Sequence, residues 1–274
     1  WTDEPDLFTQ RPALPFGQGR SYGDSCQIEN GTLLCTKALN HLISFDPDKG
    51  TLTCEGGTTL HDILRIITPT GWTLPVVPGT QFVSVGGAIA NDIHGKNHHR
   101  AGTFGCHVKG FRLRRSDGKT HECSATKNSA LFAATISGLG LTGLITEATL
   151  QLKKIPSPYL KVHTHVFHNL QEFISLNAQA EQDHEYTVAW LDCQSSGKHF
   201  GRGILIAADF TEERPPNPFN MKSKKVPCFF PATTLNRLST KCFNHLYFKK
   251  GKFKAKNTPS IEHMTPFFFP LDKV

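Results

Sequence analysis

The sequence predicts an α+β fold in which strands outnumber helices. Two pairs of strand-like segments flank the turn sequences at 46–50 and 116–118, as β-hairpins do. Helical periodicity is confined to short segments. The second half adds further strand-like segments, which we expect to form an antiparallel sheet. Together these observations indicate a mixed sheet with few helices, followed by a smaller sheet domain.

In the first half, residues 60–67 carry apolar side chains at i, i+3, i+4 and i+7. We expect a helix there, with Thr59 and Asp62 spaced as a capping box and Pro69 and Gly71 ending it. Short helices are also expected at 83–91 and 129–135. The expected strands are 42–45, 51–55, 108–115, 120–123 and 146–152.

Pro156 and Pro158 mark a domain boundary, so we expect one domain over 1–155 and a second over 156–274. Asn169 is expected to cap a helix, with Glu172 completing a capping box. Residues 211–218 are expected to form a proline-rich loop. The expected strands of this second domain are 161–167, 187–193 and 204–210.

Composition is that of a soluble globular protein: 274 residues, 38% hydrophobic and 19% charged. No apolar run approaches the length that spans a bilayer, which leaves a peripheral membrane contact open. Neither end resembles a natural terminus, so the sequence does not exclude a signal peptide. We expect a cytoplasmic protein, with a membrane-peripheral or periplasmic location as the alternative.

The cysteines are scattered, without the C-x-x-C spacing of a zinc or redox site. We therefore expect reduced and mostly buried thiols. His98 and His99 lack a carboxylate or cysteine at ligand spacing, so no metal site is expected. The eight cysteines are Cys26, Cys35, Cys54, Cys106, Cys123, Cys193, Cys228 and Cys242.

The formal net charge of +7 comes from one segment, Met221 to Lys256, which holds ten basic residues and no acidic one. The rest of the chain therefore has a net formal charge of −3. Such a segment suits a phosphate-bearing substrate or an anionic membrane surface. It also suits a purely solubilising role. Aromatic residues interleave with the lysines, but no nucleic-acid-binding module accompanies them, so nucleic acid is not an expected partner.

Three glycine-rich segments lie in the first half, at 17–24, 78–99 and 137–145. The first does not match the dinucleotide-binding fingerprint, because no helical period follows Gly23. It could still form a nest of main-chain N–H groups that holds a phosphate. The second suits a backbone laid against a polar cofactor, and equally a buried turn before a solvated loop. The glycines alone do not decide between these.

Five motifs occur in order along the first half: GRSYGD at 19–24, PGT at 78–80, VGGA at 85–88, DIHGKNHH at 92–99 and GLTG at 140–143. In this order they resemble the flavin-binding domain of the vanillyl-alcohol-oxidase type, from about residue 16 to residue 152. The resemblance implies a two-subdomain FAD-binding domain followed by a substrate domain with an antiparallel sheet. It also implies that both ends are incomplete, with part of the FAD-binding domain before residue 15 and part of the substrate domain after Val274 absent.

The resemblance places FAD between the lobes of the first domain. Some members of the family attach flavin through a histidine of the first loop, but this chain has Arg20-Ser21-Tyr22 there, so FAD is expected to be non-covalent. The expected cofactor-binding residues are Pro15, Phe16, Gly17, Gln18, Gly19, Arg20, Ser21, Tyr22, Gly23, Asp24, Ser25, Gly79, Ser84, Val85, Gly86, Gly87, Asn91, Asp92, Ile93, His94 and Ile145.

Three side chains are candidates for roles in catalysis or substrate binding. His94 could contact flavin or substrate and accept a proton, or be a structural histidine. Lys96 could orient a substrate hydroxyl or phosphate, or be a solvated lysine. By the resemblance Trp190 lines the substrate pocket; it could instead fill the core of the second domain.

The function implied by the resemblance is FAD-dependent oxidation of a secondary sugar alcohol, with hydride transfer to flavin. The implied substrate is a polyprenyl-phosphate-linked pentose, and a separate acceptor would reoxidise the flavin. The alternatives are an oxidase of soluble alditols or aldonolactones, and a truncated module that binds flavin or a polyanion without turnover.

Overall fold

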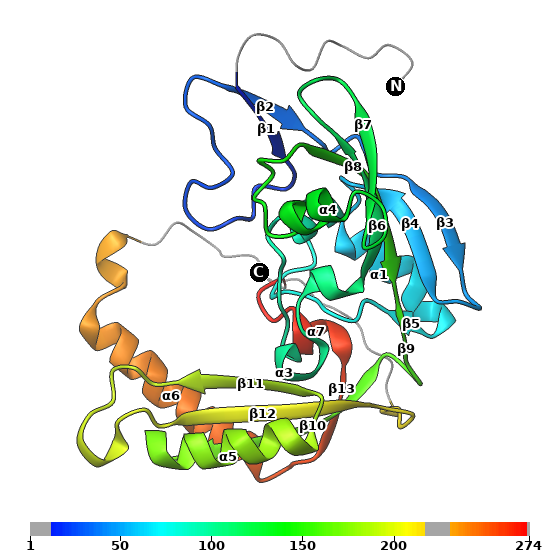
Figure 1. Cartoon of the computed structure of the whole chain (residues 1–274). Helices are drawn as coiled ribbons and strands as arrows, with labels where there is room; N and C mark the ends of the chain where they lie inside the picture. Colours follow the sequence, from blue (N-terminus) through cyan, green and yellow to red (C-terminus); the bar gives the residue numbers. More distant parts are fainter. Residues whose placement is uncertain (1–11, 217–230, 273–274) are drawn as a thin grey trace. The chain divides into compact units, whose positions relative to one another are not determined.

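A computed structural model describes residues 12–216 and 231–272 (Figure 1). The chain divides into two compact units, Trp1–Ile155 (unit 1) and Pro156–Val274 (unit 2). Helices mix with antiparallel sheets in the described residues, which agrees with the predicted α+β class. Division of the FAD-binding region into two subdomains, and the assignment of each unit to a cofactor or substrate domain, remain predictions.

Unit 1 is built on a five-stranded antiparallel sheet with the spatial order β3-β4-β8-β6-β7. The hairpins expected around the turns at 46–50 and 116–118 form its two edges, β3 with β4 and β6 with β7. Strand β8 pairs between them. The strands are β3 (Leu42–Asp46), β4 (Thr51–Glu55), β6 (Val108–Arg114), β7 (Thr120–Ser124) and β8 (Leu144–Gln151).

Two small sheets complete the strands of unit 1. β1 (Ala13–Phe16) and β2 (Thr32–Cys35) form a parallel pair, and β5 (Trp72–Thr73) pairs antiparallel with β9 (Lys153–Lys154). The long link between β1 and β2 contains no helix. This agrees with the absence of a helical period after Gly23, which distinguished the sequence from the dinucleotide-binding fingerprint. This link is the first glycine-rich loop.

Helix α1 (Leu60–Ile67) forms where the apolar spacing predicted it, and its four apolar residues are buried. The Thr59 hydroxyl accepts a hydrogen bond from the Asp62 N–H at 3.2 Å, which caps the first turn. Gly71, with φ of 83°, ends the following 3₁₀ turn η1 (Thr68–Thr70). The other helical segments of unit 1 are α2 (Val85–Ala90), α3 (His98–Ala101), η2 (Phe104–His107) and α4 (Ser129–Thr135).

Unit 2 contains a four-stranded antiparallel sheet with the order β11-β12-β10-β13. Its strands are β10 (Tyr159–Phe167), β11 (Tyr186–Leu191), β12 (Gly203–Thr211) and β13 (Ser260–His263). Its helical segments are α5 (Leu170–Asp183), η3 (Gly197–His199), η4 (Ala232–Thr234), α6 (Arg237–Ala255) and α7 (Met264–Phe268).

Helices α5 and α6 cover opposite faces of this sheet. Leu205 of β12 belongs to a buried cluster with Phe167 and with Ala180 of α5. The adjacent Ile204 points the other way, because side chains alternate along a strand, and a Cβ added at Gly251 of α6 would overlap with it. The sheet is therefore packed on both faces, with α5 on one side and α6 on the other.

Several details differ from the sequence predictions. The Glu172 carboxylate accepts a hydrogen bond from the His168 N–H at 2.7 Å, one residue before the Asn169 cap where a capping box would place it. Helix α6 was not predicted, since two of its buried positions are Asn244 and Gly251 and not apolar residues. The seven described cysteines are all free, but four of them are exposed, so the expectation of mostly buried thiols was wrong: Cys35, Cys106, Cys193 and Cys242. Cys228 lies outside the described residues.

Within residues 12–216 and 231–272, no helix combines the length and apolar character needed to cross a bilayer.

Candidate functional site

The first glycine-rich loop follows β1 and packs against the cap of α2. Main-chain hydrogen bonds hold its start, since the Thr36 N–H donates to the Phe16 carbonyl at 2.9 Å. A Cβ added at Gly17 would overlap with the Oγ of Ser84, so only glycine fits here without a shift of Ser84. The outer part of this loop is open to solvent, with the Tyr22 side chain 99% exposed.

The second segment contains α2, whose first turn is held by Ser84. The Ser84 Oγ accepts a hydrogen bond from the Gly87 N–H at 3.3 Å and so caps the helix. The Gly86 N–H donates to the Gly56 carbonyl at 2.7 Å. Gly56 in turn lies against the main-chain carbonyl of Ile145, which leaves no room for a side chain at Gly56. Ile145 and α2 are thereby brought to the same part of unit 1.

The third glycine-rich loop attaches to the end of α2. The N–H groups of Ser137 and Leu139 donate to the Ile89 and Ala90 carbonyls at 3.1 and 2.8 Å. A Cβ at Gly140 would contact Pro15 of β1 at 3.5 Å. All three glycine-rich loops therefore meet around α2, although they lie far apart in the sequence.

The segment that follows α2 carries the two candidate catalytic residues. The Asp92 carboxylate accepts a hydrogen bond from the Gly105 N–H at 2.8 Å, and the buried Asn97 amide donates to the Pro75 carbonyl at 2.9 Å. These bonds fix the backbone on both sides of His94 and Lys96. Asp92 and Asn97 therefore anchor this segment, and the role of Asp92 in cofactor binding remains a prediction.

His94 is exposed, and its ring makes an edge contact with His98 at a centroid distance of 5.8 Å. Lys96 is partly buried, and burial lowers the pKa of its ammonium group to about 8. This short segment therefore carries an exposed imidazole and, two residues later, a lysine whose pKa is lowered by burial.

The surroundings of Gly79 indicate that a large cofactor fits against these loops. A Cβ added at Gly79 would meet no protein atom within 4 Å, and Gly79 does not adopt a positive φ. Neither packing against the chain nor backbone conformation therefore requires glycine at this place. A glycine that keeps open space beside the backbone suits a site where a second molecule lies against the main chain.

Trp190 lies in unit 2, on β11. It is partly buried, and its ring lies 4.8 Å from the ring of Tyr247 on α6. Trp190 therefore packs against α6, and its role in substrate binding remains a prediction.

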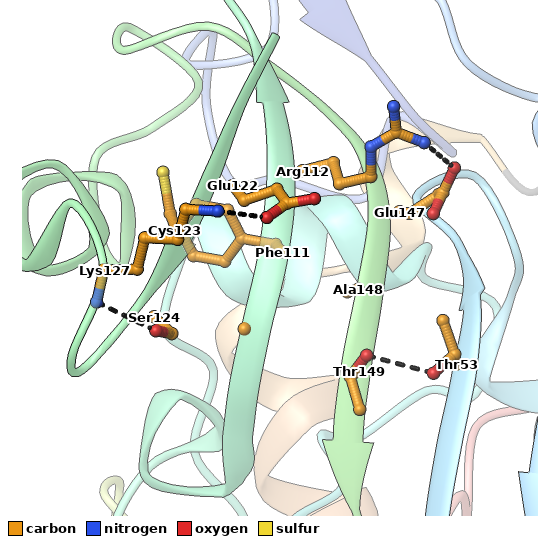
Figure 2. Close-up of a pocket in the computed structure, with 11 residues that line it drawn as sticks. Thr53, Phe111, Arg112, Glu122, Cys123, Ser124, Lys127, Glu147, Ala148 and Thr149 are labelled. Atoms are coloured by element: carbon orange, nitrogen blue, oxygen red, sulfur yellow. Dashed lines mark hydrogen bonds and ion pairs between the residues drawn. The ribbon is translucent and has the colours of Figure 1, made fainter.

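A depression of about 280 Å³ lies against β4, β6, β7 and β8, and none of the predicted site residues lines it (Figure 2). Its charged side chains pair with one another, Arg112 with Glu147 at 2.7 Å and Lys127 with Glu122 at 2.5 Å. Because these charges compensate each other, the depression offers a ligand no unbalanced charge.

Comparison with known proteins decides the nature of the site around α2. A family described as FAD binding domain matches residues 8–124, which include the first two glycine-rich segments. This part of the sequence is therefore similar to an FAD binding domain. FAD is therefore the cofactor of this chain, as the resemblance implied; the mode of attachment remains a prediction.

The names of similar proteins are consistent with an FAD binding domain. The chain is 32% identical to the decaprenylphosphoryl-beta-D-ribose oxidase of Mycolicibacterium smegmatis over 96% of this chain and 59% of the relative. It is 29% identical to the probable L-gulonolactone oxidase 4 of Arabidopsis thaliana over 61% of this chain and 30% of that protein. It is 25% identical to the human Delta(24)-sterol reductase over 81% of this chain and 42% of that protein. The chain thus spans about three fifths or less of the length of these relatives, all oxidoreductases by name.

Proposed function

We propose that this chain belongs to an FAD-dependent oxidoreductase that oxidises a secondary alcohol of a sugar, with a polyprenyl-phosphate-linked pentose as substrate. Two of the relatives named above are oxidases named for sugar-derived compounds, and the one that matches 96% of this chain is named for a decaprenylphosphoryl ribose. The observation that carries the proposal is the meeting of three glycine-rich loops around α2, beside His94 and Lys96.

The residues proposed to hold FAD are those of the three loops. Main-chain N–H groups and the Ser21 hydroxyl of the first loop would bind the phosphates, and Arg20 would add positive charge. Gly79, Gly86 and the polar side chain of Asn91 would line the rest of the cofactor. Since no histidine occupies the first loop, we propose non-covalent binding.

Bound FAD supplies the acceptor for the hydride that leaves the alcohol carbon. The chain must then accept the hydroxyl proton and hold the sugar in place. His94, whose side chain is exposed, would take that proton, while the Lys96 ammonium group would donate hydrogen bonds to a substrate oxygen. Trp190 is proposed to contact the substrate.

The lowered pKa of Lys96 sets the pH dependence of this proposal. Below its pKa of about 8 the lysine is charged and can orient a hydroxyl or phosphate. Above that value it is neutral and loses a donor and its charge. KM for an anionic substrate should therefore rise as the pH increases through about 8 in the wild type, and the Lys96→Met variant should lack this dependence.

The direct experiment mixes the flavin-loaded protein with candidate substrates in the absence of oxygen and follows loss of the visible flavin absorbance. A polyprenyl-phosphoribose is expected to bleach the flavin, and His94→Gln should slow this step by about 100-fold without releasing FAD. Lys49→Met, an exposed change on the β3–β4 turn, is the matched control and should leave the rate unchanged.

The alternatives give different results in the same experiment. Bleaching by free alditols or aldonolactones, with none by the polyprenyl-phosphoribose, would assign a soluble substrate instead. Bound flavin that none of these compounds reduces would refute the catalytic proposal and leave a flavin-binding module.

A further inference from the structure

The outer face of α6 carries apolar side chains in a single stripe. Leu238, Cys242, Leu246 and Phe253 follow one another at i, i+4, i+8 and i+15, which places them on one side of a helix. The buried positions of α6, among them Phe248, lie on the opposite side. Leu238, Leu246 and Phe253 are 78%, 60% and 71% exposed, so the stripe faces away from unit 2.

Lysines flank this stripe. Lys249, Lys250 and Lys256 are all exposed, and among the described residues none of the three makes an ion pair. The sequence from Met221 to Lys256 contains no acidic residue that could offset them. The outer face of α6, defined here as Leu238, Cys242, Leu246, Phe253 and these three lysines, is therefore both apolar and positively charged.

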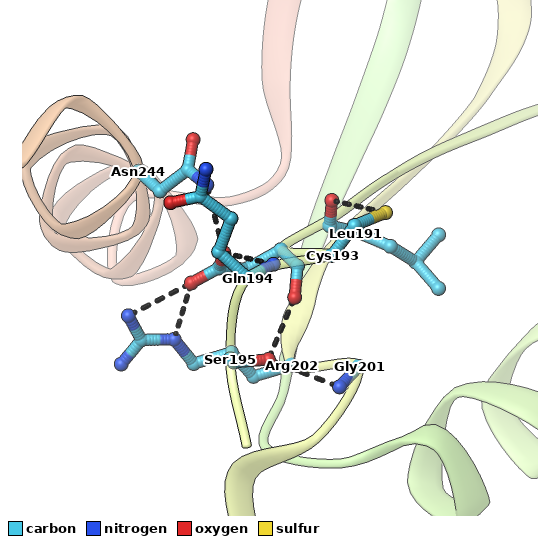
Figure 3. Close-up of polar contacts among 8 residues, drawn as sticks. Leu191, Cys193, Gln194, Ser195, Gly201, Arg202 and Asn244 are labelled. Carbon is cyan, nitrogen blue, oxygen red and sulfur yellow. Dashed lines mark hydrogen bonds and ion pairs between the residues drawn. The ribbon is translucent and has the colours of Figure 1, made fainter. Parts of the chain in front are cut away.

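Contacts on the inner side hold α6 firmly on its own unit (Figure 3). The Asn244 amide donates a hydrogen bond of 2.8 Å to the Asp192 carboxylate, which also accepts two from the Arg202 guanidinium at 3.0 and 2.9 Å. The Arg202 guanidinium carbon lies 4.8 Å from the centre of the Phe248 ring. Since these buried contacts fix the rotation of α6 about its axis, the exposure of the apolar stripe is a property of the folded unit.

We propose that the outer face of α6 binds the surface of an anionic lipid bilayer. A helix in a bilayer interface buries an apolar stripe among the acyl chains near the headgroups while flanking lysines contact anionic lipid. Both features occur on this face, and the helix lies along the surface without spanning the membrane. The proposal does not depend on the sugar substrate.

Charge and side-chain type argue against other occupants of this face. A second copy of the chain packed on the same surface would bring like-charged lysines together. A single-stranded nucleic acid stacks its bases on several aromatic side chains, whereas Phe253 is the one aromatic residue of this face and Leu238 and Leu246 are aliphatic. An anionic bilayer satisfies the lysines and the aliphatic side chains together.

The test is co-sedimentation of the flavin-loaded protein with vesicles of phosphatidylcholine alone or mixed with phosphatidylserine. We expect binding to the mixed vesicles that weakens as the ionic strength is raised. The pair Leu246→Ser and Phe253→Ser should weaken binding by about tenfold or more. The triple change of Lys249, Lys250 and Lys256 to Gln should do the same and make the salt dependence shallower.

The matched control replaces two exposed apolar residues elsewhere in unit 2, Ile174→Ser and Phe200→Ser, which are 53% and 57% exposed. This control should bind the mixed vesicles as the wild type does. Circular dichroism and flavin content establish that every variant is folded.

Four results would overturn the proposal. They are the absence of binding, equal binding to both vesicle types, an unchanged affinity after the Leu246 and Phe253 changes, and dimers in solution that dissociate on those changes. Single-stranded DNA is added as a competitor at the same total negative charge as the vesicles. If the DNA binds the protein more tightly and displaces it from the vesicles, the face is assigned to nucleic acid instead.

Discussion

The contact between Gly17 and Ser84 gives a direct test of how the first loop meets α2. A Cβ at Gly17 would overlap with the Ser84 Oγ and would lie 3.3 Å from its Cβ. Gly17→Ala should therefore cost about 2 kcal/mol of unfolding free energy, because the serine must move or lose its rotamer. Ser84→Ala alone should cost about 1 kcal/mol through loss of the helix cap.

The two changes should not add. Once Ser84 is alanine, the Oγ that blocks Gly17→Ala is gone, and the remaining Cβ contact is tight but tolerable. The double variant should therefore lose about 1.5 kcal/mol, well below the additive value of about 3 kcal/mol. Urea unfolding of the four proteins, with circular dichroism as the signal, measures this coupling. The fraction of flavin that each variant retains after desalting is a second measure of the same contact.

The result that refutes this reasoning is additivity. If the costs of the two single changes add up to the cost of the double variant within about 0.5 kcal/mol, Gly17 and Ser84 do not touch. The first loop would then not lie on the cap of α2, and the proposed FAD site would lose one of its three loops.

Three further predictions concern packing, buried charge and pH. Gly56→Ala should cost roughly 3 kcal/mol in urea unfolding, because its Cβ would overlap with the Ile145 carbonyl and a backbone atom cannot rotate away; a cost below about 1 kcal/mol on the same scale would contradict that contact. Asp192→Asn should cost about 3 kcal/mol, since it leaves a guanidinium beside an uncharged amide while keeping the shape; an unchanged urea midpoint would contradict this. Burial lowers the pKa of His263 from 6.5 to about 4, so the unfolded chain binds the proton first and stability should fall as the pH drops from about 6.5 to about 4. His263→Asn keeps an acceptor for the Thr265 N–H and should show a shallower fall; identical pH profiles would contradict the assignment.

Sequence pattern predicted the elements whose local signals agree with their final environment. Helix α1 has apolar residues at helical spacing and a capping residue at Thr59, so pattern and packing coincide. The hairpins β3–β4 and β6–β7 carry turn residues between strand-like segments. Helix α6 escaped prediction because its buried positions include Asn244 and Gly251, which lack the apolar signal of a core helix.

The candidate site was predictable in its parts and not in its assembly. The glycine-rich loops and the residues of 78–99 stand out in the sequence, and their order suggested a flavin domain. Their meeting around α2 depends on contacts such as Gly17 with Ser84 and Leu139 with Ala90, which join distant segments. No local pattern reports such contacts. The Asp192 network was missed for the same reason, since Asn244 reaches it from another element.

Equilibrium titration of the flavin-free protein with FAD tests the central claim most directly. Quenching of flavin fluorescence should saturate at one FAD per chain, weaken in the Gly17→Ala variant, and be fully reversed when the protein is denatured, because the flavin is held without a covalent bond. A folded protein that does not bind FAD, or flavin that stays with the denatured chain, would contradict the account.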